Sequence, residues 1–267
     1  MGHNGSAIFV VFYAPATATF PSIIGGGTRV TLNTRYPFGD SIEVHVTSML
    51  GVDVMLRVPG WAGAATLWTN ASPRPTALAP GAFHAVHCRP GACRLVMRLT
   101  PAVTVTPSGG GGVSIHRGPL LFALPLEEQW SQLKSYAFSS ADWEVATSSA
   151  WAVALRLRLS GGAAGGDGQQ NAQNATAPVL SHDFAVSFSP PPLDGDSPWA
   201  AARPRVTLKA RVRPLPSWTS PDGGKTAGEL PPSPACADEP CGEEREVTLV
   251  PFGNTRLRIA VFPYTLV

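Results

Sequence analysis

The chain has 267 residues and a net charge of +2, with 44% apolar and only 14% charged residues. This composition suits one large or two ordinary β domains and argues against a disordered or coiled-coil protein. The small net charge gives no field that would attract nucleic acid or an anionic membrane, so we expect neither as a partner. With 27 Gly and 27 Pro, long helices are not expected.

Strand-like segments follow one another through the first hundred residues. Ile8–Tyr13 and Arg29–Asn33 are predicted strands separated by a glycine loop. Ser41–Thr47 alternates apolar with polar residues, and this period of two predicts one buried face and one wet face. Val52–Val58 and Ala65–Thr69 continue the series.

A turn motif follows these strands. Phe83–His87 and Arg94–Leu99 flank Arg89-Pro90-Gly91, which predicts a β-hairpin. Val103–Thr106 is expected to end a first unit that spans residues 1–107, and Ser108–Gly112 is expected to be a flexible link.

A second unit is expected over residues 113–267. Its predicted strands are Val113–Leu126, Trp151–Leu159, Phe184–Phe188, Arg205–Val212, Glu246–Pro251 and Thr255–Phe262. Residues 161–177 have no apolar periodicity and are expected to form a disordered insertion. Many short strands at this spacing predict an all-β fold of two antiparallel, jelly-roll-like β-sandwich units.

Four cysteines form two pairs of equal spacing, Cys88–Cys93 and Cys236–Cys241. Each pair brackets turn residues, so each is a candidate disulfide in an oxidising compartment. Asn70 and Asn174 begin glycosylation sequons. These features favour secretion or the secretory-pathway lumen, with the cytoplasm as the alternative. No apolar run reaches the ~20 residues of a membrane helix. The first six residues do not resemble a signal peptide, and this start is expected to be internal to a longer protein.

Two clusters invite a catalytic or metal-binding reading. His84, His87, Cys88 and Cys93 do not have a standard zinc spacing, so no metal site is expected. Asp142 and Glu144 are two residues apart, but their serine-rich surroundings suggest a solvated loop rather than the acid and base of a glycosidase. The residues alone therefore predict no catalytic group.

The chain also contains seven tryptophans, and an exposed indole can stack against the apolar face of a sugar. Trp61, Trp199 and Trp218 lie beside Pro or Gly in loop-like contexts and are the candidate carbohydrate-binding residues. The competing interpretation is that each packs over the edge of a sandwich.

Several motifs together resemble a known family. They are Phe9–Pro15, Leu32-Asn-Thr-Arg-Tyr-Pro-Phe-Gly-Asp40, Leu56-Arg-Val-Pro-Gly-Trp-Ala62, Arg117-Gly-Pro-Leu-Leu-Phe-Ala-Leu124 and Val247–Pro263. In this order they resemble the middle and C-terminal β-sandwich domains that follow the catalytic barrel in glycoside hydrolase family 127, the β-L-arabinofuranosidases.

The resemblance implies that catalysis belongs to an (α/α)6 helical barrel, with a zinc-bound cysteine nucleophile, further cysteines and a glutamate. No position here matches those residues, so no cofactor is expected in this chain and zinc is expected only in the barrel. The chain alone is expected to be an inactive portion of such an enzyme, with the barrel as its partner in cis or in trans and arabinose-containing glycans as possible ligands. The alternatives are a stand-alone, lectin-like carbohydrate-binding module and a structural subunit.

Overall fold

The computed structural model describes residues 1–21, 26–70, 72–159, 180–190, 197, 199, 204–222, 228–237 and 240–267. These residues form β-strands and three short 3₁₀ turns, and none of them is in an α-helix. The predicted all-β class is therefore confirmed. The expected insertion at 161–177 lies outside the described residues.

The chain divides into two compact units. The first contains Met1–Ala102 together with Arg117–Pro119, and the second contains Val103–His116 and Leu120–Val267. The division falls before the expected boundary at residue 107, because strand β11 (Val103–Pro107) belongs to the sheet of the second unit. The expected link at 108–112 is a turn inside that unit, where the Ser108 amide donates to the Gly112 carbonyl at 2.8 Å.

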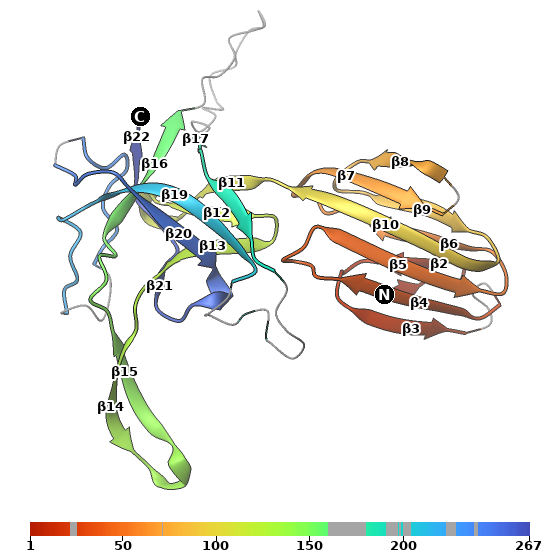
Figure 1. Cartoon of the computed structure of the whole chain (residues 1–267), viewed down its shortest axis with the longest axis horizontal. Helices are drawn as coiled ribbons and strands as arrows, with labels where there is room; N and C mark the ends of the chain where they lie inside the picture. Colours follow the sequence, from red (N-terminus) through yellow and green to blue (C-terminus); the bar gives the residue numbers. More distant parts are fainter. Residues whose placement is uncertain are drawn as a thin grey trace, which may run out of the picture. The chain divides into compact units, whose positions relative to one another are not determined.

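The first unit is a sandwich of two sheets (Figure 1). One sheet has the order β1-β2-β6-β9, with β1 Gly2–His3, β2 Ala7–Val10, β6 Val52–Arg57 and β9 Phe83–Cys88. The other has the order β3-β4-β5-β10-β7-β8, with β3 Ala16–Phe20, β4 Thr28–Thr34, β5 Ser41–Ser48, β10 Gly91–Pro101, β7 Ala62–Thr69 and β8 Ser72–Leu78. All these pairs are antiparallel except β2 with β6, which is parallel.

The core of this unit lies between the two sheets. Alternate residues of β5, namely Ile42, Val44 and Val46, are buried, as the period of two predicts. They belong to one apolar cluster with side chains of the facing sheet such as Val54 and Leu56. Burial of one face of each strand therefore holds the sandwich together.

The predicted hairpin around Arg89-Pro90-Gly91 is wrong. Strand β9 pairs with β6, whereas β10 pairs with β5 and β7, so the two strands lie in different sheets. The turn carries the chain from one sheet to the other. A Pro-Gly turn is compatible with both connections, so the turn motif alone does not determine which strands pair.

The second unit is built on a ten-stranded sheet that curls on itself (Figure 1). Its main order is β11-β12-β13-β20-β19-β16-β17, with β12 Val113–Arg117, β13 Leu120–Pro125, β20 Arg245–Pro251, β19 Val206–Pro214, β16 Val153–Leu159 and β17 Leu180–Ser181. Three short strands pair at its sides: β18 Ala185–Phe188, β21 Arg258–Ile259 and β22 Tyr264–Leu266. The pairing of β16 with β22 is parallel.

A separate hairpin extends from this unit (Figure 1). It consists of β14 Gln129–Ser135 and β15 Ala141–Ala146, joined by the 3₁₀ turn η2 Ala137–Ser139. The expectation that Asp142 and Glu144 lie in a loop is thus wrong, because both are on β15. Every residue of β14 is exposed, so no buried face gave the sequence a strand-like pattern.

Candidate functional site

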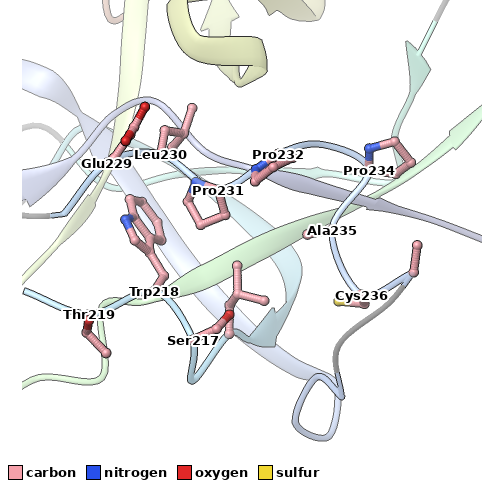
Figure 2. A pocket seen from close by; sticks show the side chains of 12 residues that line it. Ser217, Trp218, Thr219, Glu229, Leu230, Pro231, Pro232, Pro234, Ala235 and Cys236 are labelled. Atoms are coloured by element: carbon pink, nitrogen blue, oxygen red, sulfur yellow. The ribbon is translucent and has the colours of Figure 1, made fainter.

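A pocket of about 660 Å³ in the second unit lies beside Trp218. Two segments form it, 215–219 and 229–237, and Figure 2 shows their side chains around the opening. The polar part of the wall consists of the Ser217 and Thr219 hydroxyls and the Glu229 carboxylate, and the apolar part includes Pro231.

Trp218 is held in place by several contacts. Its amide donates to the Leu215 carbonyl at 3.0 Å, and its indole N–H donates to the Gly228 carbonyl at 3.2 Å. Trp151 packs against its ring at a centroid distance of 5.0 Å and an interplanar angle of 75°. With an exposed fraction of only 5%, the Trp218 ring is mainly a packing residue whose accessible part forms pocket wall.

The far wall of this pocket is tied to the C-terminal strand. The Ala235 amide donates to the Tyr264 carbonyl at 2.6 Å, and the Tyr264 amide donates to the Ser233 hydroxyl at 3.2 Å. Cys236, on the same wall, forms a disulfide with Cys241. The arrangement offers hydroxyl and carboxylate groups to a small polar ligand, but it holds no pair of carboxylates.

Trp61 lies in the first unit and is half-buried against its core. Its ring stacks on Tyr36 at a centroid distance of 6.2 Å and an interplanar angle of 18°. On Gly118, a Cβ atom would come within 3.0 Å of the same indole, so glycine at this position leaves room for the ring. Packing against Tyr36 therefore engages one face of the Trp61 ring, a surface that a sugar would otherwise use.

An ion pair next to this cluster joins two of the sequence motifs. Arg117 Nη2 lies 2.6 Å from Asp40 Oδ2, and the Arg117 side chain is only 5% exposed. The Asp40 carbonyl also accepts a hydrogen bond from the Leu99 amide at 2.9 Å. Asp40, Trp61 and Arg117 thus come from three separate motifs, and all three have structural contacts in the first unit.

Trp199 is the third predicted carbohydrate-binding residue, and it is 43% exposed. Its ring lies directly over Gly253, where an added Cβ would be 2.5 Å from the indole. The three predicted tryptophans are therefore not brought together into one site: Trp61 is in the first unit, Trp218 lines a pocket, and Trp199 covers Gly253.

The remaining predicted site residues have ordinary surroundings. Cys88 and Cys93 form a disulfide with Cα atoms 5.6 Å apart, at the corner where the chain changes sheets. Asn70 is exposed, and its side-chain amide donates to the Ala92 carbonyl at 3.2 Å. Asn174 lies outside the described residues.

The histidines near the first disulfide do not converge on a common point. His84 Nε2 is 2.8 Å from the Ala79 carbonyl, whereas His87 Nδ1 is 2.8 Å from Asp53 Oδ1. In the described part of the chain, no group of three or more His, Cys, Asp or Glu residues is placed to hold a metal ion. No helix within that part is long and apolar enough to cross a membrane.

A second aromatic cluster, which was not predicted from the sequence, lies on the β14–β15 hairpin. Trp130 and Trp143 meet edge to face with ring centroids 6.2 Å apart, and with Arg256 they line a shallow pocket. Both indoles are about half exposed, at 45% and 52%. Two tryptophans on either side of a serine-rich turn were the available signal, but without a buried face the hairpin itself was not recognisable.

No protein-family model matches the sequence, and no curated protein matches it. Solved structures do resemble the fold. A glycoside hydrolase aligns with a TM-score of 0.56 and 14% identity, over 98% of this chain and 36% of that one. A glycoside hydrolase family 127 β-L-arabinofuranosidase from Geobacillus stearothermophilus T6 aligns with a TM-score of 0.57 and 12% identity, over 98% of this chain and 34% of that one.

Another family 127 β-arabinofuranosidase aligns with a TM-score of 0.53 and 13% identity, over 96% of this chain and 34% of its own length. The likeness concerns the fold, and at that level it confirms the resemblance seen in the sequence motifs. The chain spans about a third of the length of the solved enzymes that it matches.

Proposed function

We propose that this chain is the non-catalytic β portion of a β-L-arabinofuranosidase-like glycoside hydrolase and that it supports a helical (α/α)6 catalytic barrel, in cis or in trans. The observation that carries the proposal is the fold likeness, which covers nearly the whole of this chain but only 34–36% of the solved enzymes. The remaining two thirds of such enzymes would contain the reacting groups.

The cysteines of this chain do not fit the zinc site that the family resemblance implies. Zinc is bound by the thiolate form of cysteine, and all four cysteines here are in disulfides. We therefore assign no step of the reaction to them. The disulfides and the exposed Asn70 support an extracellular or secretory location for the protein.

Two carboxylates of the second unit also have structural contacts. Glu244 accepts from Arg211 at 2.8 Å, and hydrogen bonding to this guanidinium lowers the pKa of Glu244. Asp142 accepts from the Tyr136 hydroxyl at 2.6 Å. A general acid for glycosidic cleavage needs the opposite, a raised pKa in a cleft beside a second carboxylate. These contacts favour a structural role for the two carboxylates over a catalytic one.

The family-like motifs support the same role. Their residues Tyr36, Asp40, Trp61 and Arg117 contact one another in pairs inside the first unit, where they fix loops that leave β4, β6 and β12. A rigid set of loops is what a β unit needs in order to hold a neighbouring domain in one orientation.

The test is hydrolysis of an aryl β-L-arabinofuranoside, first by this chain alone and then by the chain together with a helical partner isolated from the same source. We expect no turnover above the blank for the chain alone, and turnover when the barrel is present. Co-purification of a helical partner, or a native polypeptide far larger than 28.0 kDa on a blot, would support the assignment in trans or in cis respectively. Turnover by the chain alone would refute the proposal.

A further inference from the structure

The strongest unassigned feature is the aromatic pocket of the hairpin. In the β14–β15 register, Trp130 is opposite Val145 and Gln132 is opposite Trp143. Trp130 and Trp143 are therefore diagonal neighbours on the same face of the hairpin. Neither ring belongs to a core, and both have about half of their surface in water. Keeping two indoles this exposed forgoes the stabilisation that their burial would give.

Polar groups fix one of these rings and leave the other available. Trp130 Nε1 donates to Glu128 Oε2 at 3.0 Å, and the Leu257 amide donates to Glu128 Oε1 at 3.4 Å. Glu128 thereby joins the base of the hairpin to the segment that carries Arg256. By contrast, the Trp143 indole makes no hydrogen bond to any residue that the structure describes. Its ring contacts the Trp130 ring in an edge-to-face arrangement.

Arg256 adds hydrogen-bond donors to this pocket. Its Cζ lies 5.4 Å from the centre of the Trp130 ring, and its side chain is 78% exposed. Its Nη1 is 3.8 Å from Glu128 Oε2, beyond hydrogen-bonding distance. Within the described residues the guanidinium donates no hydrogen bond, so its N–H groups remain available to a ligand. The Arg256 carbonyl accepts from Arg258 Nη1 at 3.0 Å, which holds the backbone of this segment in place.

We propose that Trp130, Trp143 and Arg256 form a glycan-binding site, in which a sugar ring stacks on the Trp143 indole and directs acceptor oxygens at Arg256. A sugar ring combines an apolar C–H face with a rim of oxygens, and this pocket combines apolar rings with free N–H donors. A purely apolar ligand would gain nothing from Arg256, and a cationic ligand would be repelled by it. This site does not depend on the proposed catalytic partnership, because every residue in it belongs to this chain.

The acceptor oxygens can be hydroxyls of a neutral glycan or carboxylates of an acidic one, since a guanidinium binds both. The test is electrophoresis of the intact chain through native gels that contain either branched arabinan or polygalacturonate. We expect retardation in at least one gel. Retardation by arabinan would identify hydroxyl acceptors, and retardation by polygalacturonate alone would identify carboxylates.

Two variants and one matched control locate the site. Trp143→Ala removes the stacking surface, and Arg256→Gln removes the guanidinium at a position outside the hairpin while keeping both indoles. Each is expected to weaken binding at least about tenfold. The control is Phe138→Ala at the hairpin tip, which removes a fully exposed aromatic side chain outside the pocket and is expected to leave binding unchanged.

Three results would overturn the inference. They are no retardation of the unmodified chain in either gel, equal loss of binding in Phe138→Ala and Trp143→Ala, and unchanged binding in Arg256→Gln. Because Trp143→Ala also removes half of the aromatic pair, far-ultraviolet circular dichroism of each variant accompanies the gels. Arg256→Gln then decides the outcome if Trp143→Ala perturbs the hairpin.

Discussion

The buried ion pair between Asp40 and Arg117 links residues 77 positions apart in the first unit. Because the Arg117 side chain is only 5% exposed, removing Asp40 takes a charged partner from a guanidinium in a poorly solvated place. We expect Asp40→Ala to lower the free energy of unfolding of the first unit by about 3–5 kcal/mol. The measurement is urea denaturation followed by tryptophan fluorescence.

An exposed ion pair of the same unit is the matched control. Arg94 and Glu43 are hydrogen-bonded, but the Arg94 side chain is 60% exposed. Arg94→Ala is expected to cost about 1 kcal/mol or less, because solvent screens such pairs. Similar losses for Asp40→Ala and Arg94→Ala would show that the burial of Arg117 has no special energetic weight.

Tyr13 gives the first unit a dependence on alkaline pH. Its side chain is 5% exposed and its hydroxyl donates to the Arg57 carbonyl. Burial raises the pKa of Tyr13 far above the ordinary tyrosine value of about 10. As the pH rises above the ordinary tyrosine pKa, Tyr13 loses its hydroxyl proton in the unfolded chain but keeps it in the folded chain. Stability is therefore complete below about pH 10 and falls at higher pH.

For Tyr13 alone, the free energy of unfolding is expected to fall by at most about 1.4 kcal/mol per pH unit. Urea midpoints measured between about pH 8 and about pH 11 should fall for the unmodified chain and fall less steeply for Tyr13→Phe. Some slope will remain, since burial also raises the pKa of Tyr36. An identical pH dependence in the variant would exclude Tyr13 as its source.

At the scale of elements, the β14–β15 hairpin differs from every other strand pair of the described chain. Its strands pair only with each other, and β14 has no buried residue. A two-stranded hairpin of this kind is marginally stable in water. The side-chain contacts that the structure shows across the hairpin include the Trp130–Trp143 pair and the hydrogen bond from the Tyr136 hydroxyl to Asp142.

We therefore expect amide hydrogens of β14 and β15 to exchange far faster than those of β10, which pairs on both sides with β5 and β7. Hydrogen exchange followed by mass spectrometry of peptides measures this directly. Slow exchange throughout the hairpin would mean that another surface covers it. If the Trp130–Trp143–Arg256 pocket binds a glycan, adding that glycan should slow amide exchange at the base of the hairpin.

These elements also show where sequence-based prediction succeeds and fails. Strands β5 and β6 were predictable because one face of each is buried, which imposes a period of two on residues such as Ile42 and Val44. The hairpin has no such face, so nothing in its pattern marked β14 or placed Trp130 beside Trp143. The burial of Trp218 depends on its contact with Trp151, from an earlier part of the sequence, and on its hydrogen bond to Gly228, 10 positions away.

At the scale of the whole molecule, each unit has its own set of fully buried apolar residues. Leu56 and Leu95 belong to the core of the first unit, and Phe122 and Leu155 are fully buried in the second. A domain with its own core can in principle fold without further chain. The chain spans only about a third of the length of the enzymes that it resembles. Whether it folds by itself therefore decides how an absence of hydrolase activity is to be interpreted.

We expect the chain, produced alone, to have a structured near-ultraviolet circular dichroism spectrum, to bind no hydrophobic dye and to unfold cooperatively in urea. A folded chain without hydrolase activity would place the catalytic groups elsewhere, as proposed. Dye binding together with a featureless near-ultraviolet spectrum would contradict this prediction, because it would show that the cores require the rest of the enzyme. The hydrolysis assay would then have to be repeated on the assembled protein before the supporting role could be judged.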